Sequence, residues 1–211
     1  MDPLTSCTAC PRLAEYIAQA RIDHPDWHNA PVAAYGDPTA PLLIVGLAPG
    51  FGGANRTSRP FCGDRSGGWV YRALHSCGLA ANPEPLQAGG ALRGARITNA
   101  VKCVPPKNRP TGAETRTCRE RWLARELRDP AIEVVISLGG MSHQAVLDTL
   151  GARRKDHPFV HGAEHPLGGV VLLDSYHPSP HNTNTGRLNW TQFLSVFQRG
   201  VALTRSTRGE L

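Results

Sequence analysis

The chain has 211 residues, 40% of them hydrophobic and 19% charged, which excludes a disordered protein and allows one domain with a complete hydrophobic core. A net charge of +6 allows a polyanionic partner such as nucleic acid, although a mildly basic protein without such a role would carry the same charge. No apolar run is long enough to span a membrane, and MDPLTSCTAC lacks the features of a signal peptide, so we expect a soluble cytoplasmic protein with no membrane partner.

Helices and strands are predicted to alternate along the chain. In chain order we expect a helix over 11–22, a strand over 41–48, a helix from about Ser66 to residue 78, a strand over 95–103, a helix over 113–128, a strand over 131–139, a helix over 141–151, a strand from residue 169 and a helix from about Arg187 to Leu203. Residues 23–40 and 152–168 are expected to be irregular, and 204–211 a frayed tail.

This alternation is typical of an α/β fold with a parallel sheet and helices on both of its faces. No internal repeat or linker divides the chain, so residues 1–211 are expected to form a single domain. Ligands of such folds bind beyond the carboxyl ends of the strands. The loops after residues 47, 101, 138 and 174 are therefore the candidate site.

A glycine-rich loop follows the first strand in LIVGLAPGFGGANRTSRPFCGDRSG, residues 43–67. It matches neither the P-loop nor the dinucleotide-binding pattern, although its glycines would let a flat or anionic ligand approach the backbone. Phe61, in a polar loop, could stack on a planar ligand or pack in the core. Asp64 could be a catalytic acid, a surface residue or a cap for the next helix.

Two further strand ends carry polar side chains. Asn99 could read the edge of an amide-like heterocycle, or simply form a turn. The segment HPSPHNTNTGRL, 177–188, suits phosphate contacts and a loop that wedges into DNA, although ordinary turn chemistry explains part of it. There His177 could stabilise developing negative charge. Its candidate DNA contacts are Ser179, Asn182, Thr185, Arg187 and Leu188.

Six cysteines are many for a chain without a secretory signal, and a reducing compartment favours ligation over disulfides. Cys7 and Cys10 form a C-x2-C pair, while Cys103 and Cys118 are spaced C-x14-C. Four thiolates suit either a zinc ion or an iron–sulfur cluster, and scattered buried cysteines are the alternative. We expect Cys77 to be a core residue and Cys62 to have a packing role.

Together these segments resemble the uracil-DNA glycosylase superfamily, in particular its family five, the iron–sulfur B-type group. The resemblance rests on GLAPG with GANRTSRPFCGDRSG, ITNAVKC with PPKNRP, the cysteines and HPSPHNTNTGRL, in matching order over nearly the whole chain. It implies a three-layer α/β/α sandwich with a central four-stranded parallel sheet. It also implies a 4Fe-4S cluster on Cys7, Cys10, Cys103 and Cys118, built by the segments 1–22 and 103–118.

The resemblance further implies a function, which is excision of uracil, and of other deaminated bases such as hypoxanthine or xanthine, from DNA to leave an abasic site. The damaged nucleotide is flipped into a pocket. Phe61 would stack on the base, Asn99 would read its edge, and Gly46 and Ala48 of GLAPG would complete the pocket. Asp64 and His177 would be catalytic, and Ser66 would join the DNA contacts. We expect a monomer that works at the nucleoid.

The first motif carries no acid, because Leu47 and Phe51-Gly52-Gly53 stand where better-known families keep a polar residue. This favours family five and leaves Asp64 as the candidate acid. Gly52, Ser58 and Cys62 differ from many relatives and leave the base preference open. Alternatives are a non-catalytic binder of damaged or single-stranded DNA, and a cluster-bearing redox or nucleotide-binding enzyme, which the missing phosphate-loop pattern disfavours.

Overall fold

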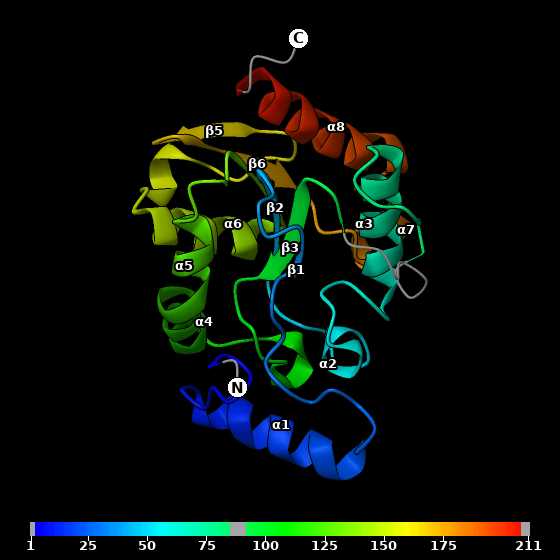
Figure 1. Ribbon diagram of the computed structural model, residues 1–211, viewed down its shortest axis with the longest axis vertical. Coiled ribbons are helices and arrows are strands. Elements are labelled where there is room, and N and C mark those ends of the chain that lie inside the picture. The colour runs from blue at the N-terminus through cyan, green and yellow to red at the C-terminus, as the bar shows by residue number, and fades with distance from the viewer. Residues whose placement is uncertain (1–2, 85–91, 208–211) are drawn as a thin grey trace.

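The computed structural model describes residues 3–84 and 92–207, which form one central sheet with helices on either side (Figure 1). Within these residues the sheet has six strands in the order β1-β3-β2-β4-β6-β5. The strands are β1 (Tyr35–Gly36), β2 (Leu42–Gly46), β3 (Ala95–Asn99), β4 (Val134–Leu138), β5 (Glu164–Leu167) and β6 (Val170–Ser175).

The four central strands β3, β2, β4 and β6 are parallel to one another, as the sequence predicts. The expectation of a four-stranded sheet is nevertheless wrong, because β1 and β5 add antiparallel pairs at the two edges. β1 has only two residues, and β5 lies in the segment 152–168 that was expected to be irregular. Short edge strands such as these carry little periodicity for sequence patterns to detect.

The pleat of the strands divides the core into two layers. On β2, Leu42 and Ile44 pack in one hydrophobic cluster, while Leu43 and Val45 pack in another. Successive side chains of a strand point to opposite faces, so a continuous apolar run is what a strand covered on both sides requires. The predicted three-layer α/β/α sandwich is therefore confirmed.

The helices of the described residues differ in length. They are α1 (Pro11–Asp23), α2 (Ala54–Thr57), α3 (Arg65–Ser76), α4 (Gly112–Cys118), α5 (Ala124–Leu127), α6 (Gly140–Leu150), α7 (Pro180–Asn184) and α8 (Trp190–Thr207), with short turns η1 (Pro106–Asn108), η2 (Arg119–Leu123) and η3 (Arg154–Asp156). α3 and α8 pack on one face, and α5 and α6 on the other (Figure 1). No helix in the described ranges has the length and apolarity to cross a bilayer.

Local sequence explains most helix ends. α1 begins at a proline, and α6 ends at Gly151, whose φ of 73° is left-handed. The predicted last helix, 187–203, corresponds to α8, which begins at Trp190 and continues to Thr207, while the short helix α7 lies before it in the segment 177–188. Part of the expected frayed tail is thus helical, and residues 208–211 lie outside the described residues.

The predicted helix over 113–128 contains a π-helical turn. A capping box between Thr111 and Glu114 begins α4, and η2 follows directly after Cys118. Such turns are rare and often occur at functional sites. Here the turn directly follows buried Cys118, which belongs to one hydrophobic cluster, and ends at Leu123, which belongs to another.

Candidate active site

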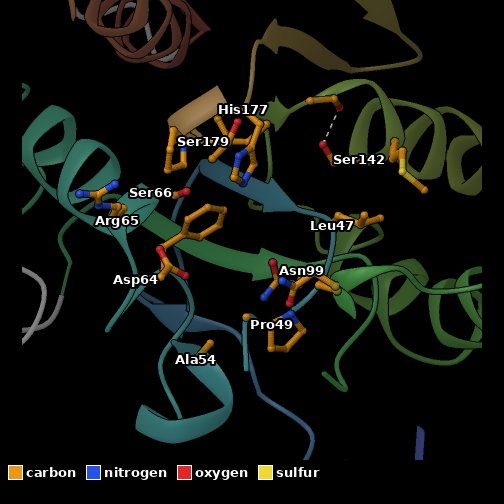
Figure 2. A pocket seen from close by; sticks show the side chains of 18 of the residues that line it. Leu47, Pro49, Ala54, Asp64, Arg65, Ser66, Asn99, Ser142, His177 and Ser179 are labelled. Atoms are coloured by element: carbon orange, nitrogen blue, oxygen red, sulfur yellow. Dashed lines mark hydrogen bonds between the residues drawn. The ribbon is translucent and has the colours of Figure 1, made fainter. Parts of the chain in front are cut away.

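A cavity of about 610 Å³ opens at the carboxyl ends of the central strands. Each of the four parallel strands contributes to its wall, through residues 47–50 after β2, Asn99 at the end of β3, residues 138–142 around the end of β4, and residues 177, 179 and 180 after β6. In Figure 2, Asp64, Asn99 and His177 enter this space from three separate elements. The cavity lies where an α/β sheet is expected to bind its ligand.

Phe61 provides an aromatic wall of the cavity. It is 7% exposed and has a φ of 54°, a left-handed conformation that is costly for an aromatic residue. Two contacts hold the loop in this shape. The Tyr71 hydroxyl donates to the carbonyl of Pro60 at 3.3 Å, and a Cβ added at Gly67 would lie 1.9 Å from the Phe61 carbonyl oxygen. Glycine at position 67 is therefore required for this loop conformation.

Gly46 lies directly behind Phe61 and Asn99. An added Cβ would lie 2.5 Å from Asn99 Oδ1 and 2.7 Å from Phe61 Cζ. Gly46 is also the register partner of Asn99 in the parallel pair β2–β3. Asn99 as a whole residue is 3% exposed, and no hydrogen-bond partner occurs for its carboxamide among the described residues. Because Asn99 lines the cavity, its carboxamide can offer a donor and an acceptor to a polar ligand there.

Asp64 has two roles in the structure. It is the N-cap of α3, with Oδ1 accepting from the backbone N–H of Gly67 at 2.9 Å, and it also lines the cavity. Capping of the next helix, one of the roles that the sequence leaves open for Asp64, is therefore confirmed. Oδ2 faces Gly53, where an added Cβ would be only 2.7 Å away. One oxygen fixes the carboxylate while the other stays available.

His177 lies across the cavity, with its ring centroid 6.0 Å from that of Phe61. Its backbone carbonyl accepts from Ser179 N and from Asn182 Nδ2, both at 2.8 Å, which fixes the loop after β6. Burial lowers the pKa of His177, and the negative charge of Asp64 opposes this only in part. The imidazole is therefore neutral near pH 7, with one N–H to donate.

The four predicted ligand cysteines come together at a second place. Four cysteines line one small cavity, which we call the cysteine cavity: Cys7 and Cys10 before α1, Cys103 in the loop after β3, and Cys118 at the end of α4. Burial, followed by the charges of Cys118, Cys7 and Cys10, raises the pKa of Cys103 to about 12. Burial likewise raises the pKa of Cys118 to about 11.

This donor set fits a thiolate-ligated metal group. Four soft sulfur donors around one buried space suit zinc or an iron–sulfur cluster, and ligation would displace the thiol protons that burial otherwise retains. Cys62 is 2% exposed and lies outside the cysteine cavity, and Cys77 packs against the core, as expected for both.

Comparison with known proteins places this architecture in a family. The sequence profile of the uracil DNA glycosylase superfamily matches residues 33–199. The chain belongs to the uracil DNA glycosylase superfamily. A Type-5 uracil-DNA glycosylase of Thermus thermophilus is 46% identical, over 96% of each chain, and one of Pyrobaculum aerophilum is 40% identical, over 96% of this chain and 91% of that one. A Type-4 uracil-DNA glycosylase of Thermotoga maritima is 29% identical, over 84% and 79%.

The predicted resemblance to family five is thus confirmed, and the structure brings most of the expected pocket residues of this superfamily member together. Phe61, Asp64, Asn99 and His177 line one cavity with Ala48, Ser66 and Ser179, and Gly46 lies behind Phe61 and Asn99. The sequence predicted a site formed by the loops after the strands, but it did not predict every residue that lines the cavity. Arg65, Asn108 and the first turn of α6 also line it.

Asn108 is the clearest residue that the sequence interpretation missed. It lines the cavity with a φ of 55°, next to Lys107 with a φ of 56°. Two successive left-handed residues other than glycine are uncommon and cluster at functional sites. The asparagine in PPKNRP was the available signal, but the sequence does not specify its backbone conformation.

The expected DNA contacts after β6 differ in their exposure. Thr185 and Arg187 are exposed, and the Arg187 guanidinium lies 4.4 Å from the centre of the Tyr176 ring. Asn182 is half-buried and supports the His177 carbonyl. Leu188 is only 1% exposed and belongs to the main core cluster, so the structure contradicts its placement at the DNA surface.

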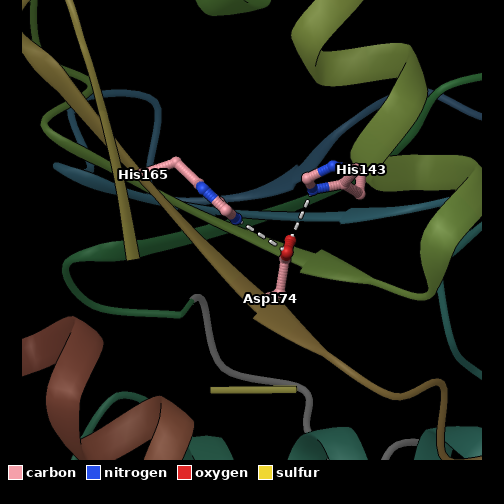
Figure 3. A group of neighbouring side chains, drawn as sticks. All are labelled: His143, His165 and Asp174. Carbon is pink, nitrogen blue, oxygen red and sulfur yellow. Dashed lines mark hydrogen bonds and ion pairs between the residues drawn. The ribbon is translucent and has the colours of Figure 1, made fainter. Parts of the chain in front are cut away.

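A buried polar cluster joins α6, β5 and β6 (Figure 3). The carboxylate of Asp174 on β6 accepts hydrogen bonds from His143 Nδ1 at 2.7 Å, His165 Nε2 at 2.9 Å and Ser137 Oγ at 2.8 Å. The spacing of His143, His165 and Asp174 would also allow a metal ion. However, the other nitrogen of His143 already contacts the His157 carbonyl at 2.9 Å, so hydrogen bonding alone accounts for the cluster.

Proposed function

We propose that this protein is a monofunctional DNA repair glycosylase that flips uracil out of DNA and hydrolyses its N-glycosidic bond, leaving an abasic site. Hypoxanthine and xanthine are further candidate substrates. The observation that carries this proposal is the single cavity that joins an aromatic ring, a carboxamide, a neutral imidazole and a carboxylate. The names of the relatives support the same activity.

Substrate binding follows from the shape and lining of the cavity. Its volume lies within the usual range for small-molecule pockets, about 300–1,000 Å³. A flipped base would stack on Phe61, while the Asn99 amide, with both a donor and an acceptor, would pair with the carbonyl and N–H groups of its edge. Ala48 and the glycine at position 46 leave space for the ring.

Base departure requires stabilisation of an anion. When the bond between the base nitrogen and C1′ of the sugar breaks, its electron pair moves to the base and negative charge develops on a carbonyl oxygen. A neutral His177 would donate its N–H to that oxygen. Because the ring is neutral beforehand, this bond strengthens as the charge develops, and such a difference lowers the barrier.

The sugar becomes positively charged in the same step, and water attacks C1′. Asp64 is held by the Gly67 N–H through Oδ1, so Oδ2 is fixed beside the cavity. Its negative charge would stabilise the oxocarbenium-like state or orient the attacking water. Both roles need the charge, whereas capping of α3 needs only an oxygen.

This distinction gives the test. Asp64→Asn retains a capping oxygen, so we expect normal folding and normal binding of uracil-containing DNA, with base release reduced by at least about 100-fold. Release is measured by cleaving abasic sites with alkali in an end-labelled duplex. Full activity of Asp64→Asn would refute its catalytic role. Wild-type protein that binds uracil-DNA tightly without releasing base would favour the alternative of a non-catalytic damage binder.

We further propose a 4Fe-4S cluster on Cys7, Cys10, Cys103 and Cys118. The cluster would hold the segment before α1 against α4, as the shared cavity of the four thiols supports. Protein purified without oxygen should be brown, and Cys118→Ser should lose both iron and colour. Cys77→Ser, outside the cysteine cavity, is the matched control and should lose neither. A colourless wild-type protein loaded with zinc would contradict the proposal.

DNA binding would use the exposed Thr185 and Arg187 together with Ser66, Ser179 and Asn182 around the cavity. We propose that a monomer acts in the cytoplasm, at the nucleoid during repair. Size-exclusion chromatography with light scattering tests the oligomeric state.

A further inference from the structure

A buried lysine lies beside the cysteine cavity. Lys102 directly precedes Cys103, is 1% exposed and lines the same cavity as the four cysteines. Its backbone N–H also donates to Cys118 Sγ at 3.2 Å. Lysine is among the residues that are almost never fully buried unless they are paired. Its location therefore needs an explanation.

The ammonium group of Lys102 is held by acceptors on two elements. Nζ donates to the two carboxylate oxygens of Glu126, at 2.7 and 2.8 Å, and to the Thr98 hydroxyl. These three acceptors match the three N–H bonds of the ammonium group. The charge of Lys102 is thus fixed in place within the protein interior.

The pair has a direction relative to the thiols. Lys102 lines the cysteine cavity, whereas Glu126 does not and its side chain is 17% exposed. The residue with the positive charge therefore belongs to the wall of the cysteine cavity and contacts Cys118 through its backbone, whereas the residue with the negative charge lies outside that wall and closer to solvent. In a weakly polarisable interior the nearer charge acts more strongly.

We propose that Lys102 and Glu126 form an oriented charge pair that tunes the reduction potential and retention of the metal group bound by the four cysteines. The inference rests on the proposed 4Fe-4S cluster. Such a cluster with four thiolates is an anion, and one added electron makes it more negative. A fixed cation favours the reduced form and an anion disfavours it, because cluster potentials depend on nearby charge and on hydrogen bonds to sulfur.

A purely structural role predicts something different. Lys102 and Glu126 also join the end of β3 to α5, so removing either one would lower stability. Both variants would then have a lower free energy of unfolding, with no opposite change in reduction potential. Electrostatic tuning instead predicts opposite signs, with a lower potential in Lys102→Met and a higher potential in Glu126→Gln.

The experiment compares these variants with wild-type protein, all purified without oxygen. Arg121→Met is the matched control, because Arg121 is an exposed cation on the same cavity and solvent screens its charge. Protein-film voltammetry gives the potential, and the loss of visible absorbance with an iron chelator gives cluster retention. We expect opposite shifts of about tenfold in the reduction equilibrium, or about 59 mV for one electron, a smaller shift in Arg121→Met, and faster cluster loss in Lys102→Met.

The outcomes are separable. Shifts of the same sign, or none, in cluster-loaded Lys102→Met and Glu126→Gln would overturn the inference. If Lys102→Met does not fold, Glu126→Gln must still raise the potential and Lys102→Arg must keep it near that of the wild type. Wild-type protein without iron would instead refute the cluster, and with it the basis of this inference.

Discussion

Replacing Gly46 with alanine should disable the cavity while leaving the fold intact. The new methyl group would meet Asn99 Oδ1 at 2.5 Å and two ring atoms of Phe61 at 2.7 and 2.8 Å. Because carbon atoms normally lie about 3.5–4.0 Å apart, the Phe61 ring must move by about 1 Å. The atoms in contact are the ends of two side chains that face the cavity, so they can move without unfolding the sheet.

Two magnitudes follow from this contact. Overpacking costs about 1–3 kcal/mol, less than the total stability of a typical domain, about 5–15 kcal/mol. A catalytic group misplaced by about 1 Å can reduce the rate by about 100-fold, which is about 2.7 kcal/mol in the barrier. Activity should therefore be lost far more completely than folding.

The assay is single-turnover base release from a uracil-containing duplex, with thermal unfolding in parallel. Gly46→Ala should be about 100-fold slower and unfold roughly 2–12 °C lower. Gly52→Ala is the control, because its Cβ would meet nothing within 4 Å and it lies in the loop after the same strand. A folded Gly46→Ala protein with the wild-type rate would refute the reasoning, as would an equal loss in Gly52→Ala.

Four further results are expected. Since burial lowers the pKa of His177 and Asp64 opposes this, Asp64→Asn should lower that pKa further in an NMR titration of the ring, and a rise would contradict the assignment. In wild-type protein the neutral ring should persist below the ordinary histidine value of about 6.5, so the acidic limb of base release that reports His177 should lie below that pH. Asp174→Asn leaves a donor facing a histidine N–H, so the free energy of unfolding in urea should fall by about 3–5 kcal/mol. The control is Asp156→Asn, in the exposed pair with Arg153, which should lose only about 0–1 kcal/mol. Equal losses in the two variants would count against a stabilising role of the buried cluster. Leu188→Ala should lower the free energy of unfolding by about 2–5 kcal/mol. Unchanged stability would instead favour the expectation that Leu188 contacts DNA.

The sequence predicts the centre of the fold better than its edges. The parallel strands are apolar runs between glycine and proline, and their order in the chain implies the layers and the edge at which ligands bind. β1 and β5 escape prediction because two or four partly exposed residues gain their strand conformation from the neighbouring strand and not from their own pattern.

In the site, chemical type was predictable and conformation was not. Phe61, Asp64, Asn99 and His177 were recognised from residue type, motif and resemblance, and they line one cavity. The left-handed backbone at Phe61 depends on contacts beyond its immediate neighbours, such as that of Gly67 beneath the Phe61 carbonyl, and the sequence does not reveal these contacts. Leu188 was misplaced because a leucine in a polar loop has the same signal whether it faces DNA or the core.

The small cluster of Leu13, Val101 and Cys118 also has a consequence for the order of events during synthesis. Its N-terminal member is made roughly a hundred residues before its last one, and chains are extended at about 5–20 residues per second. α1 therefore waits on the order of 5 to 20 s before the surface that covers its apolar side exists. During that interval Cys7 and Cys10 are already made, whereas Cys103 and Cys118, which line the same cavity, are still to be translated. The apolar side of α1 must therefore stay unaggregated until Cys118 leaves the ribosome.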